Sequence, residues 1–188
     1  KSLLPMHHTK KILVVCSSLG GGGAEKVAID VANGFQHLNC KVNIFAIHEK
    51  TEYAHLINSA VHYEFGAGNK ASFNVLGIIR KINAFKPDII FVSQNYLCFW
   101  VFLAQKLAKN CNSQLFVREG STPSANIPKS VKGFFIKSLV KVTYSYADHV
   151  IATCDYVRKD IQNFLGIKKY FLLLSYIVQL PYFSVHHY

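Results

Sequence analysis

The chain of 188 residues is long enough to bury one sizeable hydrophobic core. Its 51% hydrophobic and 16% charged residues exclude an intrinsically disordered protein, and no stretch reaches the roughly 18 apolar residues of a membrane-spanning helix. Its 21 Lys and Arg against 10 Asp and Glu give a net charge of +11, which predicts an anionic partner: phosphorylated substrates, an anionic membrane surface or nucleic acid.

Residues 11–38 predict a strand, a glycine loop and a helix in succession. Residues 12–16 are apolar and rich in β-branched side chains, which is typical of a strand covered on both faces. Gly20 to Gly23 follow, and apolar residues then recur at steps of three and four through residues 24–38, as on one face of an α-helix. Glycines can adopt positive φ and let a ligand approach backbone amides, and a helix start attracts phosphate. We therefore expect a phosphate at Gly21, Gly22 and Gly23; the alternative is a tight connection that binds nothing.

Two well-known phosphate-binding loops do not fit this spacing. In the dinucleotide fingerprint G-x-G-x-x-G, the third glycine would fall on Glu25 or Lys26. A P-loop needs Gly-Lys-Ser/Thr, whereas Lys26 lies between Glu25 and Val27. A phosphate bound here is therefore expected to be held in neither of these two ways.

Strands and helices alternate along the rest of the chain. We expect strands at residues 41–47, 61–65, 88–92, 114–117 and 149–153, and helices at residues 73–85, 97–108, 127–147 and 155–165, the third of them starting at Pro128. This alternation predicts an α/β fold with a Rossmann-like, doubly wound, mostly parallel sheet and helices on both faces. The carboxyl ends of the strands then meet at one edge, where such sheets bind ligands.

Polar residues follow two of these strands. Asn95 ends the tripeptide that follows residues 88–92, and Arg118 and Glu119 follow residues 114–117, so we expect them to face one cleft. The alternatives are a turn role for Asn95 and a mutual ion pair between Arg118 and Glu119. Asp148 precedes its strand, which predicts a linker role at the opposite edge.

The helix at residues 127–147 has apolar residues on two sides. One stripe is expected to face the core: Val131, Phe134, Phe135, Ser138, Leu139 and Val142. On the other side Ile136 and Val140 are bordered by three lysines, Lys129, Lys132 and Lys137. Apolar residues ringed by lysines suit a helix that lies on an anionic bilayer surface. The alternative is that the lysines are solvated while Ile136 and Val140 pack on a neighbouring loop.

The cysteines and the final residues give weaker indications. Five scattered cysteines without a C-x-x-C pair predict reduced core thiols in a cytosolic protein, and we expect no metal because no cluster has ligand spacing. Residues 167–188 contain no acidic residue and show no clear period. We expect a tail at residues 1–10, one domain at residues 11–166 and an atypical apolar tail at residues 167–188.

Three segments, taken in order, resemble the N-terminal domain of a family 4 glycosyltransferase of the GT-B fold, over residues 11–166. They are Gly22-Gly23-Ala24-Glu25-Lys26-Val27-Ala28, Lys86-Pro87-Asp88-Ile89-Ile90 and Tyr146-Ala147-Asp148-His149-Val150-Ile151-Ala152. Arg118-Glu119 followed by Pro123 resembles the Arg/Ser-Glu segment of members that add hexose or N-acetylhexosamine to lipid-linked bacterial glycans. The order and spacing of these segments carry the resemblance.

The resemblance implies transfer of a sugar from a nucleotide-diphosphate donor to an acceptor hydroxyl with retention of configuration, without a cofactor. It implies that the loop at Gly21, Gly22 and Gly23 approaches the donor diphosphate, where amides stabilise the leaving phosphates. Asn95, Arg118 and Glu119 would then grip the acceptor, and Glu25 would orient the loop or the acceptor. No catalytic residue can be assigned.

The sequence departs from the family pattern after residue 166. Family members carry a second Rossmann-like domain that binds the nucleotide, whereas this chain continues into the atypical tail. We therefore expect a truncated or frame-shifted gene or a split enzyme, inactive alone, with a separate C-terminal half. We expect it in the cytoplasm, peripheral on the inner face of the membrane.

Other functions stay open. One is a non-catalytic basic α/β module at an anionic membrane surface. Another is a methyltransferase-like or reductase domain with Glu49 as the acidic ribose partner, which the failed fingerprint disfavours. Nucleic acid is not expected as a partner, because the aromatic residues do not interleave with lysines on one face.

Overall fold

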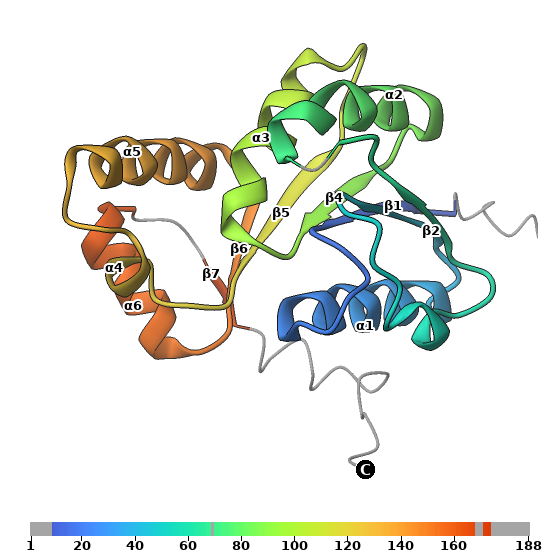
Figure 1. Cartoon of the computed structure of the whole chain (residues 1–188), viewed down its shortest axis with the longest axis horizontal. Coiled ribbons are helices and arrows are strands. Elements are labelled where there is room, and N and C mark those ends of the chain that lie inside the picture. Colours follow the sequence, from blue (N-terminus) through green and yellow to red (C-terminus); the bar gives the residue numbers. More distant parts are fainter. Residues whose placement is uncertain (1–8, 69, 168–170, 174–188) are drawn as a thin grey trace, which may run out of the picture.

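The computed structural model of the chain describes residues 9–68, 70–167 and 171–173. They form a seven-stranded sheet in which all neighbouring strands are parallel, in the order β3-β2-β1-β4-β5-β6-β7 (Figure 1). From β1 to β3 the chain adds strands toward one side of the sheet, and from β4 onward it adds them toward the other side. The direction of strand addition therefore switches between β1 and β4. The strands are β1 (Lys11–Cys16), β2 (Lys41–Ala46), β3 (His62–Phe65), β4 (Ile89–Val92), β5 (Gln114–Glu119), β6 (His149–Ala152) and β7 (Phe171–Leu173).

Helices cover both faces of this sheet, which confirms the predicted Rossmann-like architecture (Figure 1). α1 packs against one face, and residues of α2, α3, α5 and α6 join the hydrophobic cluster on the other. The helices are α1 (Gly23–His37), α2 (Val75–Phe85), α3 (Asn95–Leu107), α4 (Pro123–Asn126), α5 (Val131–Tyr146) and α6 (Asp155–Leu165), with 3-10 turns η1 (Ala54–Leu56) and η2 (Ala71–Asn74). Because clusters lie on both faces, the apolar side chains of β1 from Ile12 to Cys16 are completely buried.

Two aspartates link neighbouring strands by hydrogen bonds at the amino-terminal edge of the sheet. Asp88 Oδ2 accepts a hydrogen bond from Lys11 N at 2.8 Å, and Asp148 Oδ2 accepts one from Leu115 N at 2.7 Å. Each carboxylate thus satisfies the backbone at the start of a neighbouring strand. Asp148 therefore has the linker position predicted for it, at the edge opposite the strand ends that Asn95 and Arg118 follow.

The long helix α5 starts later than predicted. Ser130 caps it, since its Oγ accepts a hydrogen bond from Gly133 N at 3.2 Å, so the helix begins at Val131 rather than at Pro128. The turn is tight: a Cβ on Gly133 would overlap the carbonyl oxygen of Pro128. Residues 123–126 form the separate short helix α4, which the sequence did not predict.

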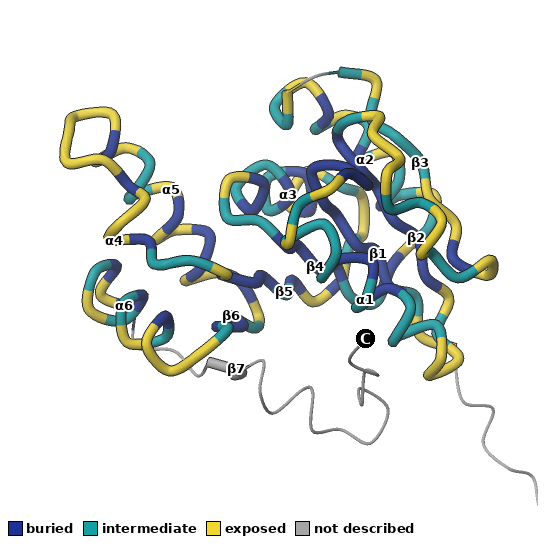
Figure 2. The backbone as a smooth tube through the Cα atoms, turned by 60° about the horizontal axis from the view of Figure 1, so that its bottom comes forward, coloured by how far each residue is buried: buried dark blue, intermediate teal, exposed yellow. Residues whose placement is uncertain are grey.

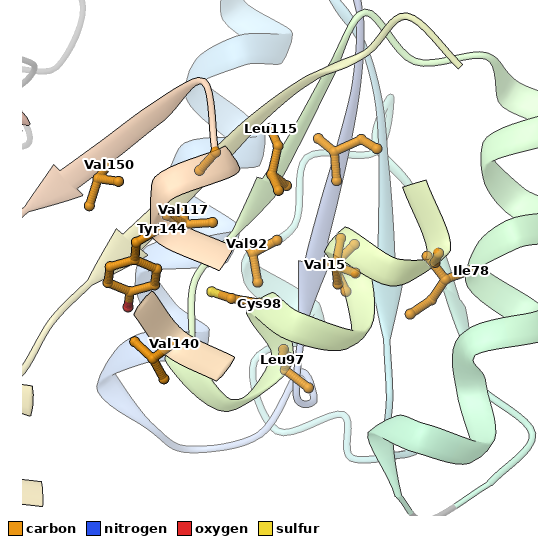
Figure 3. Packing of buried hydrophobic residues seen from close by; sticks show 14 of the residues in the cluster. Val15, Ile78, Val92, Leu97, Cys98, Leu115, Val117, Val140, Tyr144 and Val150 are labelled. Atoms are coloured by element: carbon orange, nitrogen blue, oxygen red, sulfur yellow. The ribbon is translucent and has the colours of Figure 1, made fainter. Parts of the chain in front are cut away.

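The buried face of α5 is the opposite of the predicted one. Val140 and Tyr144 lie in the core with residues of β5 and α3, as Figure 3 shows, and Ile136 packs against the same cluster. The five apolar residues of the stripe predicted for the core are 41 to 77% exposed, and Figure 2 shows α5 with exposed residues along its length: Val131, Phe134, Phe135, Leu139 and Val142. Both faces of this helix are apolar, so periodicity alone does not choose between them, and the small Gly133 and Thr143 permit close packing on the observed side.

The membrane-facing surface predicted around Ile136 and Val140 is therefore wrong. Both side chains are inside the domain, and Lys137 Nζ lies 4.0 Å from the centroid of the Phe164 ring in α6. Lys129 and Lys132 are exposed.

The prediction that all five cysteines are core thiols is also wrong. Cys16 and Cys98 are buried, Cys40 and Cys111 are half-buried, and Cys154 is exposed. Within the described ranges, no helix has the length and apolar character needed to cross a bilayer.

The predicted boundary at residue 166 stays a prediction. Ile167 is buried in the core, and β7 pairs with β6. Residues 1–8 of the predicted amino-terminal tail, and residues 168–170 and 174–188 of the predicted apolar tail, lie outside the described ranges.

Candidate functional site

A cleft of 530 Å³ opens at the carboxyl ends of β4 and β5, beside the start of α1. It brings together four of the predicted site residues, Gly23, Asn95, Arg118 and Glu119. Its remaining lining residues are Ala24, Ser93, Gln94, Tyr96, Gly120 and Ser121. Gly21, Gly22 and Glu25 are not among them, so the predicted set is only partly assembled around one space.

The glycine loop presents only its last residue to the cleft. α1 begins at Gly23 with Gly22 as N-cap, and no side chain caps the helix start. Gly22 N donates a hydrogen bond to Gly20 O at 3.0 Å, so this amide is already used. The space next to Gly23 is open, because a Cβ built on it meets no atom within 4 Å. Gly23 and Ala24, the first residues of α1, therefore line the cleft, and a helix start is a position that suits an anion.

The glycines of this loop, Gly20 to Gly23, do not have positive φ. Among the glycines that the structure describes, Gly166 alone has positive φ, at 66°. A Cβ on Gly22 would overlap the carboxylate of Glu25, so a larger residue there would displace the end of that side chain. The glycine at position 22 thus leaves room for the observed position of Glu25.

Glu25 is held inside the loop by two side chains from neighbouring strand ends. Its Oε1 accepts hydrogen bonds from Ser17 Oγ and from Gln94 Nε2, the latter at 2.8 Å. Gln94 also bonds Ser17 twice: Nε2 donates to Ser17 Oγ at 2.8 Å, and Oε1 accepts from Ser17 N at 2.9 Å. Of the two roles predicted for Glu25, this geometry favours orienting the loop over contacting an acceptor.

Glu119 joins three elements through a buried carboxylate. It is 2% exposed, and Oε2 accepts from Tyr144 OH of α5 at 2.7 Å and from Asn95 Nδ2 of α3 at 3.3 Å. Oε1 accepts from Ser121 N at 3.0 Å and Ser121 Oγ at 2.9 Å. Burial, and then the proximity of Cys98 and Glu119, raise the pKa of Tyr144 well above its usual value, so its hydroxyl stays a donor. Asn95 is therefore the first residue of α3 and a partner of Glu119, not a turn residue.

Arg118 and Glu119 do not form the mutual ion pair considered above. Successive strand residues point to opposite faces, which sends Glu119 toward α3 and α5 and Arg118 toward the face covered by α1. No carboxylate in the described ranges forms a salt bridge with Arg118. Burial lowers the pKa of Arg118, and the nearby charge of Glu119 opposes this only in part.

Sequence reasoning missed Ser17 and Tyr144, and it marked Gln94 only as part of the polar tripeptide that ends in Asn95. Ser17 and Gln94 follow β1 and β4, so their place at strand ends is a signal that could have marked them. Tyr144 had no such signal, because its role depends on which face of α5 is buried. Tyr96, a further lining residue, is 53% exposed and its pKa is raised by burial above all.

Comparisons with known proteins identify the family and the fold of the chain. The sequence model of Glycosyltransferase Family 4 matches residues 21–170. The chain belongs to glycosyltransferase family 4. No curated protein sequence matches it.

Two solved structures have a fold similar to that of this family 4 chain. HepE from Anabaena in complex with UDP has a TM-score of 0.68 and 15% identity over 87% of this chain. The lipopolysaccharide outer core galactosyltransferase WaaB has a TM-score of 0.62 and 19% identity over 84% of it. At such identities the likeness shows the fold alone, that of one Rossmann-like half of a GT-B glycosyltransferase. The chain spans 43% of the length of either protein.

Proposed function

We propose that this domain is the acceptor-side half of a retaining glycosyltransferase that moves a hexose or N-acetylhexosamine from a nucleotide-diphosphate sugar to a lipid-linked bacterial glycan. The observation that carries the proposal is the cleft in a family 4 chain where Gly23 of α1, Asn95 of α3 and Arg118 of β5 converge. HepE has been solved with UDP and with UDP-glucose, which supports a nucleotide sugar as donor. The lipid-linked acceptor rests on the resemblance of Arg118-Glu119 to a segment of members that use one.

The residues of this domain would act by holding and orienting rather than by proton transfer. Cleavage of the sugar–phosphate bond leaves negative charge on the diphosphate, and the start of α1 at Gly23 and Ala24, which lines the cleft, would stabilise that charge. Glu25 and Glu119 are both engaged by protein donors, which leaves neither as an obvious base. Because HepE and WaaB are each about twice as long as this chain, we propose that a second domain completes the donor site.

The test pairs two glycine variants. The full chain would be mixed with a family 4 donor-binding domain, and transfer of labelled sugar from UDP-sugars to a lipid extract would be measured. Gly23→Leu should reduce transfer about 100-fold, because the side chain would fill the cleft in front of the amides. Gly21→Leu is the matched control, since its Cβ also meets no atom within 4 Å and Gly21 does not line the cleft. Equal rates for the two variants would remove the basis of the proposal.

A second activity, docking on an anionic bilayer, is favoured by the exposed side of α5. Phe134 and Phe135 are 69% and 64% exposed on a stripe with Val131, Leu139, Val142 and Tyr146. Helical spacing puts Lys132 and Lys141 at the two edges of this stripe, and residues 120–147 contain no acidic side chain. An amphipathic helix flanked by lysines binds a surface that is apolar inside and negatively charged outside. We propose that this stripe, rather than the predicted Ile136 and Val140, lies on the membrane.

Flotation with phosphatidylglycerol vesicles tests the docking. The double variant Phe134→Ser/Phe135→Ser should lose about 100-fold in binding, since each ring gains about 1–2 kcal/mol on entering the bilayer. Phe73→Ser is the matched control, because Phe73 is 71% exposed but lies outside α5. Binding that survives the double variant, or that is equal on neutral phosphatidylcholine vesicles, would contradict the proposal.

A further inference from the structure

Arg118 is a buried cation that forms no salt bridge within the described part of the chain. The residue is only 9% exposed, and its Nε has no hydrogen-bond acceptor among the residues that the structure describes. A buried guanidinium needs ion pairs or hydrogen bonds to offset its lost hydration, and a lowered pKa is the expected sign that it lacks them. A buried polar group that lines a cleft and lacks a hydrogen-bond partner is typical of a residue that binds a ligand.

A glycine two residues after Arg118 leaves space for its guanidinium beside the cleft. A Cβ on Gly120 would lie 3.0 Å from Nη1 and 3.2 Å from Nη2, so the absence of a side chain at Gly120 gives the guanidinium its room. The same cleft is lined by Gly23 and Ala24, the first residues of α1, and by Asn95, the first residue of α3. A cation and two helix amino ends therefore border one space of 530 Å³.

Neither of the two carboxylates nearby forms a salt bridge with this cation in the described ranges. Glu25 is engaged by Ser17 and Gln94. Glu119 accepts four hydrogen bonds from other groups, at 2.7 to 3.3 Å. The oxygens of both carboxylates are therefore directed at other groups, and neither accepts a hydrogen bond from Arg118 Nε.

We propose that Arg118 binds a phosphate or diphosphate group in this cleft, with one or both Nη atoms and Nε donating to phosphate oxygens. A guanidinium fork matches two phosphate oxygens at once, which an amide or a hydroxyl cannot do. The origin of the phosphate, a lipid-linked acceptor or a nucleotide donor, rests on the proposed function, whereas the binding itself does not.

Calorimetric titration of the full chain with inorganic pyrophosphate tests the site. Arg118→Gln should weaken binding about 10-fold or more, and Arg118→Lys, which keeps the charge but loses the fork, should weaken it less. Arg80→Gln is the matched control, because Arg80 is an exposed arginine on α2 that carries the same charge. Equal affinity of Arg118→Gln and the natural chain, or equal losses in Arg118→Gln and Arg80→Gln, means an adventitious ion only and overturns the proposal.

A second variant covers the case in which Arg118→Gln fails to fold. Gly120→Leu keeps the arginine and puts a large side chain where the guanidinium lies, so it should also weaken pyrophosphate binding. Unchanged affinity in a folded Gly120→Leu chain contradicts the site. Repeating the titrations with UDP and with dimethylallyl diphosphate distinguishes the sources: the compound whose affinity depends more on Arg118 identifies the donor or the lipid-linked acceptor.

The outcome is separable from that of the proposed function. Loss of pyrophosphate binding in Arg118→Gln, together with no sugar transfer in the two-domain assay, would leave the phosphate site standing and remove the transferase proposal. Sugar transfer in the two-domain assay, together with pyrophosphate binding that does not depend on Arg118, would support the transferase proposal and remove the phosphate site.

Discussion

Replacing Glu119 by alanine should destabilise the domain by about 2–4 kcal/mol, a large part of the 5–15 kcal/mol typical of a domain. The main loss comes from Tyr144, whose side chain is completely buried and whose hydroxyl would lose its acceptor at 2.7 Å. A buried hydroxyl without a partner costs about 1–3 kcal/mol. The missing methylene and carboxylate add a cavity term of about 1 kcal/mol. Asn95 and Ser121 border the cleft, where water can replace the carboxylate.

A double-mutant cycle tests whether this mechanism is correct. Tyr144→Phe alone leaves three hydrogen bonds to Glu119 and should cost about 1 kcal/mol. Glu119→Ala/Tyr144→Phe removes both members of the pair, so it should be about 1–2 kcal/mol more stable than the sum of the single changes predicts. Urea unfolding gives all four free energies of unfolding, and Glu49→Ala, at an exposed glutamate, should change stability by less than about 0.5 kcal/mol. A Glu119→Ala loss below about 1 kcal/mol, or strictly additive single effects, would refute the reasoning.

Three further changes probe packing and titration. Gly133→Ala should lower Tm by about 5 °C or more in calorimetry, since its Cβ would overlap the carbonyl oxygen of Pro128; an unchanged Tm would show that the turn yields freely. In maleimide labelling Cys154 should react at once and Cys16 only on unfolding, because burial raises the pKa of the Cys16 thiol to about 12; early modification of Cys16 would contradict its burial. The folded chain therefore holds this proton more tightly than the unfolded chain, so stability should fall from about pH 9 toward pH 12, and fall less in Cys16→Ala. Parallel urea midpoints for the two chains over that range would count against the shift.

The sheet was predictable because its signals are local. The run from Ile12 to Cys16 reads as a strand without reference to other residues, and alternation with helices then implies parallel order and a common edge for Asn95 and Arg118. The face of α5 was not predictable in this way. Its two sides are both apolar, and the choice depends on Glu119, which is distant in sequence and accepts the hydroxyl of Tyr144. A hydrogen bond between residues 119 and 144 leaves no trace in periodicity.

The network around Glu25 escaped prediction for a similar reason. Ser17 and Gln94 are separated by 77 positions, and only the pairing of β1 with β4 brings them together. Spacing could indicate that Glu25 lies near the glycines, but not that its carboxylate would lie over Gly22 and be engaged from both strands. A sequence motif can therefore identify the loop. Which side of the loop the Glu25 carboxylate fills, and which side stays open, depends on long-range contacts.

Two carboxylates border the proposed phosphate site, and protein donors orient each of them. Glu25 lies against Gly22, where Ser17 and Gln94 hold its carboxylate. Gly23 and Ala24 at the start of α1 line the cleft without Glu25, and Arg118 lines it with them. Glu119 also lines the cleft, but its oxygens accept hydrogen bonds from Tyr144 and Ser121. An anion in the cleft would therefore meet Arg118 and the start of α1, while the two carboxylates, which keep their charge, turn their oxygens toward other donors.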